Sequence, residues 1–197
     1  MSRRAILVAG CLIGLFGRPA AAEPTEAESR AAARQVLIAL RVLAYDKSLA
    51  TRRPGDGVTI MIVSRSTASS RRERERWEAG FSLLPKIKVG GRLVRVLGLD
   101  FQSEQAFAAT VAKYLPAAVI VVSDIAAELP AIRKVSRARD MLTLSQREQA
   151  VRDGLAVGLV AGAERAEIVI NVEAAREEGV RFGAGLLQLA RLVDEVP

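Results

Sequence analysis

Short apolar runs alternate with amphipathic segments along the chain. Runs that are apolar and β-branched on both faces indicate strands of a parallel sheet that helices cover on both sides. These runs predict strands at residues 58–63, 93–97, 117–122, 141–144, 155–160 and 167–172. Apolar residues at helical spacing predict helices at residues 25–44, 68–84, 103–114, 124–137 and 145–153, and a last helix that includes 186–191.

This alternation of strands and helices predicts the fold class α/β. We expect a single domain with a mostly parallel sheet flanked by helices, flavodoxin-like or similar to one lobe of a periplasmic binding protein. The short connection at residues 162–166 favours a hairpin, and therefore an antiparallel C-terminal strand pair.

Local signals predict how some helices begin. Ser145 and Glu148 have the spacing of a capping box, so Ser145 is expected to open the helix that follows it. Pro130 lies inside the segment 124–137 and requires a bend if that segment is one helix. Asn171 interrupts an apolar strand, which favours an N-cap that turns the chain into a helix, with ligand contact as the alternative.

The amino end has the pattern of a secretory signal peptide. A basic segment, Met1–Arg4, precedes twelve apolar residues, Ala5–Phe16, which are too few to span a bilayer as a helix. Small residues follow at Ala20–Ala22, so we expect cleavage after Ala22 and a mature domain of residues 23–197. The expected location is the periplasm, and an uncut amino-terminal anchor is the alternative.

Cys11 is the single cysteine of the chain and lies inside the apolar run. The sequence Val8–Cys11 fits a lipoprotein processing box, but the run continues to Phe16, whereas a lipid-modified cysteine follows its apolar run. Lipidation of Cys11 therefore stays open as the less favoured alternative. If the signal peptide is removed, the mature chain has no cysteine and must be held together by its core alone.

Charge and composition exclude several functions. The whole chain has 29 basic and 22 acidic residues, and removal of Arg3, Arg4 and Arg18 leaves 26 against 22, a mature charge of +4. This excess is modest and no basic block alternates with aromatic residues, so a nucleic-acid surface is not expected. Without histidine the commonest general base and metal ligand are missing, so we expect no metal and no cofactor, and the usual catalytic groups are absent. A hydrolase that uses Asp100 or Asp124 is the weakest alternative.

Polar residues follow the predicted strands where each strand ends, at the edge of the sheet where open α/β folds bind ligands. They are Ser64, Arg65 and Ser66 after the first strand, Ser123 and Asp124 after the third, and Ser145 after the fourth. Their hydroxyls, helix amides and the Arg65 guanidinium could bind a phosphate or a carboxylate. The alternative is that Ser66, Ser123 and Ser145 are ordinary N-caps, which capping preference alone explains.

The last predicted helix carries a broad apolar face. Phe182, Leu186 and Leu187 contribute to that face and Arg191 lies beside it. Packing on the sheet is the simpler interpretation, and a surface for a partner protein or for a homodimer is the alternative.

Several segments together resemble the YfiR/HmsC-like family of periplasmic proteins. The resemblance spans residues 36–193 and is concentrated in Tyr45-Asp46, Gly154–Leu159, Ile170-Asn171, Glu178-Gly179, Phe182 and Leu186–Arg191. The ending is the most specific part, because its Ile-Asn, Gly, Phe and Leu-Leu-x-Leu-Ala pattern matches the family in order.

The resemblance implies an exported bacterial α/β protein that regulates without catalysis. Its expected partner is the extracytoplasmic part of an inner-membrane signalling protein, either a diguanylate cyclase or a histidine kinase. The expected outcome is control of cyclic-di-GMP and biofilm formation. The alternative function is periplasmic binding of a small anion or metabolite.

Overall fold

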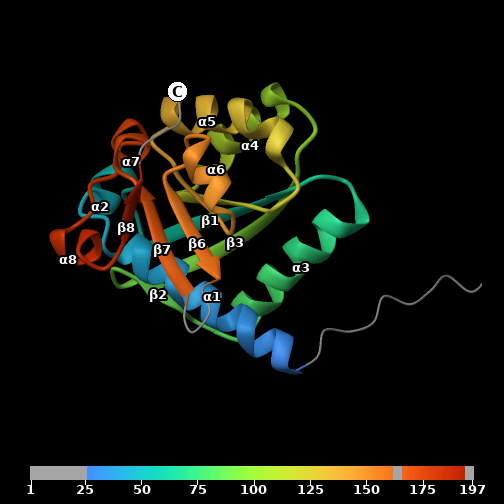
Figure 1. The fold of residues 1–197 in the computed structure, drawn as a ribbon, viewed down its shortest axis with the longest axis horizontal. Helices are drawn as coiled ribbons and strands as arrows, with labels where there is room; N and C mark the ends of the chain where they lie inside the picture. Colours follow the sequence, from blue (N-terminus) through green and yellow to red (C-terminus); the bar gives the residue numbers. More distant parts are fainter. Residues whose placement is uncertain (1–25, 162–165, 194–197) are drawn as a thin grey trace, which may run out of the picture.

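The computed structural model describes residues 26–161 and 166–193 as one sheet between two layers of helices (Figure 1). The strands are β1 (Gly57–Ser64), β2 (Lys88–Val89), β3 (Arg92–Asp100), β4 (Ala118–Val121), β5 (Leu142–Ser145), β6 (Val157–Ala161), β7 (Ala166–Asn171) and β8 (Arg191–Val193). The helices are α1 (Glu26–Ala44), α2 (Leu49–Arg52), α3 (Ala68–Ser82), α4 (Glu104–Tyr114), α5 (Leu129–Ala138), α6 (Glu148–Arg152), α7 (Val172–Glu177) and α8 (Ala184–Leu187), with a 3-10 turn at Ala126–Glu128. The predicted signal peptide, Cys11 and most of the hairpin connection lie outside the described residues.

The sheet is mostly parallel, which confirms the predicted fold class. Its strand order is β2-β3-β1-β4-β5-β6-β7-β8. The central strands β3, β1, β4, β5 and β6 pair in parallel, whereas β6 and β7 form the expected antiparallel pair. A further short strand, β8, then pairs in parallel with β7 at the edge of the sheet.

Each face of the sheet has its own apolar core because the central strands are apolar on both sides. On one face α1 and α3 pack on side chains such as Ile60, Ile62 and Ile120. On the other face α4, α5 and α6 cover side chains such as Met61 and Val119 (Figure 1). No described helix is long and apolar enough to cross a membrane.

The contact between α1 and α3 depends on Gly80. A Cβ added at Gly80 would lie 2.8 Å from the carbonyl carbon of Ala32 and 2.9 Å from its oxygen. Real Cβ atoms do not approach backbone atoms this closely, so only glycine lets the two helices lie at this separation. Trp77, one turn before Gly80, is buried in the same interface.

The order of the strands creates a switch point between β1 and β4. The chain leaves β1 through α3 on one face, whereas it leaves β4 through α5 on the other face. Loops that diverge in this way leave room at the carboxyl ends of the two strands, which is where such sheets bind ligands.

Two predicted helix starts are wrong. Ser145 ends β5 and is buried, and the N-cap of α6 is Arg147 without a side-chain cap, so the capping box does not form. Pro130 does not bend a helix that begins at residue 124, because α5 begins at Leu129 and places the proline in its first turn, where no amide donor is needed.

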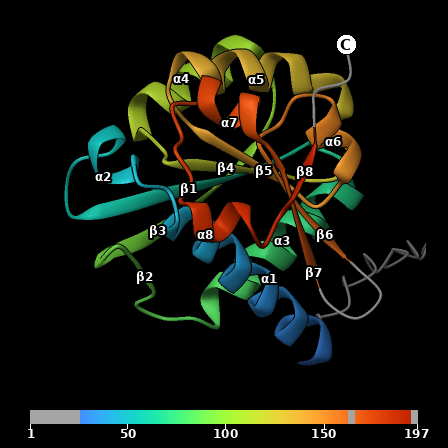
Figure 2. The same ribbon diagram turned by 60° about the vertical axis from the view of Figure 1, so that its left-hand side comes forward.

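The carboxyl end also differs from the prediction. The last helix closes at Leu187, and Arg191 begins β8, where it pairs with Val169. The sequence pattern is helical, but the free edge of β7 offers backbone hydrogen bonds that a longer helix would forgo. Figure 2 shows α8 beside α1, and an added Cβ at Gly185 would lie 3.7 Å from the Tyr45 ring.

Candidate functional site

The carboxyl ends of the parallel strands bring the predicted polar residues to one edge of the sheet. Ser64 lies at the end of β1 opposite Asp100 of β3, and Ser145 ends β5 opposite Val121 of β4. Ser123 and Asp124 follow β4 after one residue, Val122. The sequence therefore predicted the neighbourhood of these groups correctly, while their partners come from helices that no strand pattern could specify.

Asp124 occupies the position at the switch point where an anionic ligand would bind. Its Oδ2 accepts hydrogen bonds from the hydroxyls of Thr67 at 3.0 Å and Ser69 at 3.2 Å, both at the amino end of α3. The N-cap of α3 is Thr67, whose side chain accepts the amide of Ser70, so the capping role predicted for Ser66 belongs to its neighbour. Ser66 itself is exposed.

The charge of Asp124 is stabilised in this position. Burial by itself raises the pKa of the carboxyl, but hydrogen bonds from the Ser70, Thr67 and Ser69 hydroxyls and the nearby Arg65 charge outweigh it, so the pKa lies below its ordinary value. Arg65 also forms an ion pair with Glu128 at 3.1 Å. Arg65, the predicted cation of the anion site, is thus already paired with a carboxylate of the protein.

Two of the other predicted hydroxyls, those of Ser64 and Ser123, are also paired with carboxylates. The Ser64 hydroxyl donates to Asp100 at 2.9 Å, and Arg74 of α3 donates to the same carboxylate at 2.5 Å. The backbone amide and hydroxyl of Ser123 both donate to Glu73, the hydroxyl at 2.8 Å. Burial raises the pKa of Asp100, whereas hydrogen bonds from Ser64 and Arg74 and the charges of Arg74 and Arg71 bring it below its usual value.

A small hollow remains at this edge between β4, β5 and α6. It has a volume of about 70 Å³ and is lined in part by Ser123, Ser145 and Arg147. Binding sites for metabolites usually measure about 300–1,000 Å³, so this hollow has room for a few water molecules or a very small anion. The Ser145 hydroxyl accepts the backbone amide of Arg147 at 3.3 Å, which is its contact in place of a helix cap.

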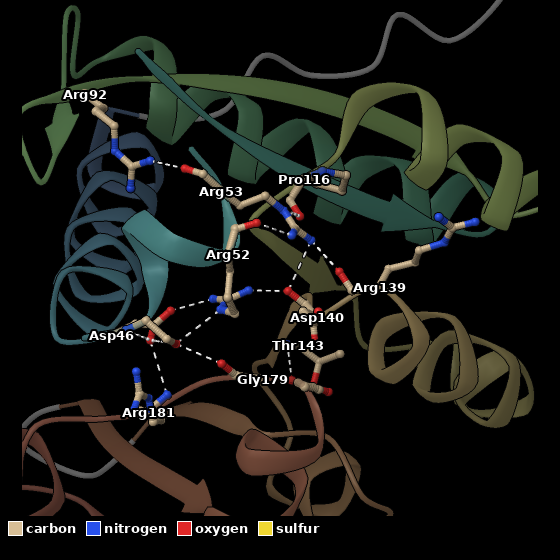
Figure 3. Close-up of polar contacts among 12 residues, drawn as sticks. Asp46, Arg52, Arg53, Arg92, Pro116, Arg139, Asp140, Thr143, Gly179 and Arg181 are labelled. Atoms are coloured by element: carbon tan, nitrogen blue, oxygen red, sulfur yellow. Dashed lines mark hydrogen bonds and ion pairs between the residues drawn. The ribbon is translucent and has the colours of Figure 1, made fainter. Parts of the chain in front are cut away.

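A second polar cluster lies at the opposite edge of the sheet (Figure 3), and its residues Asp46, Ser48 and Glu178 are buried. Asp46, directly after α1, accepts hydrogen bonds from the amides of Ser48 at 2.9 Å and Arg181 at 3.2 Å. Arg52 of α2 forms an ion pair with Asp46 at 2.5 Å, with 6% of the arginine side chain and none of the aspartate side chain exposed. The Ser48 hydroxyl lies 2.8 Å from the carbonyl oxygen of Gly179.

Arg53 extends this cluster toward the loops that precede β4 and β5. Its guanidinium donates to the carbonyl oxygens of Pro116 at 2.9 Å and Arg139 at 2.5 Å, and Arg92 of β3 donates to the carbonyl oxygen of Arg53 (Figure 3). Burial is the main reason that the pKa of Arg53 lies below its ordinary value. At the amino edge, arginine side chains thus satisfy the carbonyl groups of neighbouring loops.

Glu178 connects the carboxyl end of the chain to the centre of the sheet. Both of its carboxylate oxygens accept hydrogen bonds from Thr143 of β5. Burial raises the pKa of the Glu178 carboxyl to about 8, with hydrogen bonds from Thr143 acting in the opposite direction. Asp46 and Glu178-Gly179 lie far apart in the sequence, and the structure brings them together as one structural cluster.

The four residues predicted for partner binding lie in the segment around α8. Leu186 is 1% exposed and belongs to the core, while Phe182 and Leu187 are half-buried against it. Arg191 forms ion pairs with Glu148 at 2.6 Å and Glu167 at 2.8 Å. The apolar face of α8 therefore packs on this chain itself.

Two leucines that the prediction did not select are exposed beside these residues. Leu189 is 73% exposed and Leu192 is 52% exposed. Helical periodicity predicted a helix as far as Arg191, whereas α8 ends at Leu187. Leu189 lies in the turn that follows α8, and Leu192 lies in β8.

Among the described residues, no group of histidine, cysteine or carboxylate side chains could hold a metal ion. The asparagine predicted as a cap behaves as expected: the Asn171 side chain accepts the amide of Ala174 at 2.9 Å and opens α7.

Solved structures share this architecture at low sequence identity. The ligand-free, open structure of CD0873, a substrate-binding protein with adhesive properties from Clostridium difficile, has a TM-score of 0.54 at 12% identity over 76% of this chain and 58% of that chain. A conserved domain protein from Vibrio cholerae has a TM-score of 0.60 at 12% identity over 82% of this chain and 59% of that chain. An ABC domain from Streptococcus pneumoniae in complex with L-Trp has a TM-score of 0.51 at 15% identity over 77% and 62%.

These similarities concern the fold alone, and this chain spans about three fifths of the length of each of the three proteins. No curated protein matches the sequence significantly. A family model, in contrast, matches residues 48–191, which is most of the chain. The chain therefore belongs to the YfiR/HmsC-like family.

Proposed function

We propose that this chain is an exported, non-catalytic regulator that acts in the periplasm. In this proposal it binds the extracytoplasmic part of an inner-membrane signalling protein, a diguanylate cyclase or a histidine kinase, and modulates its activity. Family membership supports the regulatory role. The resemblance stated for the sequence implies the class of partner.

The observation that carries the proposal is that the polar groups at the switch point between β1 and β4 are already hydrogen-bonded to one another. Asp124 fills the anion position at the amino end of α3, and the neighbouring hydroxyls are paired with carboxylates. A fold that uses this edge for its own hydrogen bonds is better suited to present surfaces than to enclose a substrate. This argues for recognition of another macromolecule.

For the contact surface we propose the segment around α8 and β8. Phe182 and Leu187 are half-buried there, and Leu189 and Leu192 add exposed apolar area beside them. Arg191 would hold β8 in place through its pairs with Glu148 and Glu167. A homodimer through the same surface is the competing assembly.

A crosslinking capture from solubilised membranes tests the partner. The tagged full-length chain is expressed in its own host, crosslinked, purified and read by mass spectrometry. We expect one inner-membrane cyclase or kinase to dominate the captured proteins. Its yield should be lower when the Leu189→Ser/Leu192→Ser variant is used for capture. Recovery of this chain alone, crosslinked to itself, would favour the homodimer and count against the regulator.

Two further parts of the proposal have separate tests. Cleavage after Ala22 predicts that the mature protein begins at Glu23, which amino-terminal sequencing of the periplasmic fraction reads directly. Control of cyclic-di-GMP predicts that deletion of the gene changes its cellular level and biofilm formation. Unchanged levels would restrict the proposal to a kinase partner.

Binding of a small anion or metabolite is the second candidate, supported by the similarity in fold to a substrate-binding protein. The proposed ligand-binding groups are Ser64, Arg65, Ser66, Ser123, Asp124 and Ser145. A ligand at 100 times its dissociation constant stabilises a protein by about 2.7 kcal/mol, so a thermal-shift panel would detect it. We expect no shift for the wild type, and a shift with phosphate for Asp124→Ala, which vacates the anion position.

A further inference from the structure

One corner of the sheet is left uncovered where α4 ends. β1 begins at Gly57, which pairs with Leu93 of β3, and α4 closes at Tyr114. Gly57, Thr59, Tyr114 and Leu115 line a hollow of about 320 Å³ together with Arg52, Arg53 and Pro54. None of the residues that line it carries a carboxylate.

Three apolar side chains are exposed around this hollow. Leu93 is 47%, Tyr114 43% and Leu115 57% exposed. Leu115 ends α4 with a φ of 45°, in the left-handed region that a bulky residue rarely adopts. Glycine or asparagine would cap the helix there without strain, so the leucine presents an apolar side chain to solvent at a cost in stability.

Three cations surround these apolar side chains. Lys88 of β2 lies directly opposite Leu93, and so on the same face of the sheet, and Arg95 follows on that face. The Lys113 ammonium lies 4.9 Å from the centre of the Tyr114 ring. Within residues 26–161 and 166–193, the side chains of Lys88 and Arg95 have no hydrogen-bond or ion-pair partner.

We propose that this basic apolar patch, formed by Lys88, Leu93, Arg95, Lys113, Tyr114 and Leu115, docks the protein on a membrane that contains anionic phospholipid. Lysine and arginine near such a surface each contribute about 1 kcal/mol of attraction. Aliphatic side chains insert at the boundary between headgroups and acyl chains, where tyrosine is also enriched. The patch combines these three elements within one corner of the fold.

The structure favours a lipid surface over an acidic protein segment. At this end of β3 the backbone is already paired with β2, through Lys88 with Leu93 and Val89 with Arg92, so an extended segment cannot pair with β3 beside Leu93. The apolar side chains lie between the cations. Such an arrangement suits a layer of anionic lipid headgroups, because the lipids can move to meet each cation while the apolar side chains insert. This inference goes beyond the proposed partner and does not depend on it.

Vesicle co-sedimentation of the purified mature chain tests the inference. The vesicles contain phosphatidylcholine alone or phosphatidylcholine with about 30% phosphatidylglycerol, at low and high salt. We expect binding to the anionic vesicles only, weakened by salt. Lys88→Gln/Arg95→Gln/Lys113→Gln should lower the partition coefficient on the order of 100-fold.

Two further variants separate the patch from general charge and from folding. Arg30→Gln/Lys134→Gln/Arg176→Gln removes the same net charge from exposed ion pairs elsewhere, and its partition coefficient should stay within about threefold of wild type. Leu115→Asn keeps the left-handed cap, so it should fold at least as stably while binding anionic vesicles several-fold more weakly.

Equal binding to both kinds of vesicle, or equal loss in the two triple variants, would overturn the inference. If the wild type does not bind vesicles, but the Lys88→Gln/Arg95→Gln/Lys113→Gln variant captures less crosslinked partner than the wild type, the patch would be assigned to an acidic protein instead. Failure to capture any signalling protein would refute the proposed regulatory function but would not affect the conclusion on membrane binding.

Discussion

The two carboxylate oxygens of Glu178 accept hydrogen bonds from one residue, Thr143: its backbone amide donates at 2.8 Å and its hydroxyl at 2.7 Å. The same hydroxyl accepts the amide of Ala156 at 2.8 Å. Three segments therefore meet at one buried threonine: β5, the loop before β6 and the end of α7. Because Glu178 is fully buried, this junction holds a titratable group inside the fold.

The raised pKa of Glu178 predicts that the free energy of unfolding falls as pH rises from about 4.5 to about 8. In this window the folded chain holds a proton that the unfolded chain, with a carboxyl pKa of 4.5, has released. The free energy of unfolding should decrease by at most about 1.4 kcal/mol per pH unit. Urea unfolding at a series of pH values measures it.

Glu178→Gln isolates this effect. The glutamine side-chain oxygen can accept the amide of Thr143, and its NH2 group can donate to the Thr143 hydroxyl oxygen. The variant should therefore fold, and its stability should be flatter between these pH values. Asp100, Asp124 and Glu148 have lowered pKa values, which remove stability only at more acidic pH. A wild type with constant stability across the window would contradict the prediction.

Arg52→Ala should strongly destabilise the fold. It leaves Asp46 buried without its cation, and breaking such a pair costs about 3–5 kcal/mol. The matched control is Arg176→Ala, whose pair with Glu173 is exposed and contributes less than about 0.5 kcal/mol. Equal midpoints of chemical unfolding for the two variants would show that the Asp46 cluster is not a structural anchor.

Gly80→Ala should also destabilise, although alanine is the better helix former by about 1 kcal/mol. The new Cβ meets the backbone of Ala32 at 2.8 Å, which a side-chain rotation cannot relieve, so α1 and α3 must separate at a cost of about 1–3 kcal/mol. Gly185→Ala is the control, because its Cβ would meet only the Tyr45 ring at 3.7 Å. Thermal unfolding should place Gly80→Ala well below the control, and the reverse order would refute the close contact.

Leu189→Ser and Leu192→Ser should weaken partner capture while leaving the fold intact. Both side chains are more than half exposed, so their loss removes interface area and little core packing. Leu186→Ala provides the contrast, because it opens a cavity in the core and should cost about 2–5 kcal/mol of stability. The serine variants should therefore lower the crosslinked yield, and Leu186→Ala should lower the unfolding midpoint. Capture that is unaffected by both serine changes would exclude this surface.

Sequence reasoning succeeded where a signal is local and periodic. The strand Val58–Val63 and the helix after Ser103 form where expected, because an apolar run and a capping serine act within a few residues. It failed at Ser145 and Arg191 for the same reason. A buried strand end and the free edge of β7 compete with the local helical signal, and neither competitor is visible within the segment.

For the candidate site, too, the sequence predicted one part and the packing of the elements decided the other. That Ser64, Ser123 and Asp124 would share one edge is a consequence of parallel strands, which the order of elements already implies. That Asp124 would itself fill the amino end of α3 depends on two loops that meet only when β1 and β4 pair.

The sequence by itself determined the class of fold, the order of most of its elements and the family resemblance, because periodicity and short motifs are properties of neighbouring residues. Only the tertiary structure decided which polar groups are satisfied. The pairing of Glu178 with Thr143 joins residues 35 positions apart, and burial decides its protonation. Such contacts depend on how the layers pack, which no local pattern encodes.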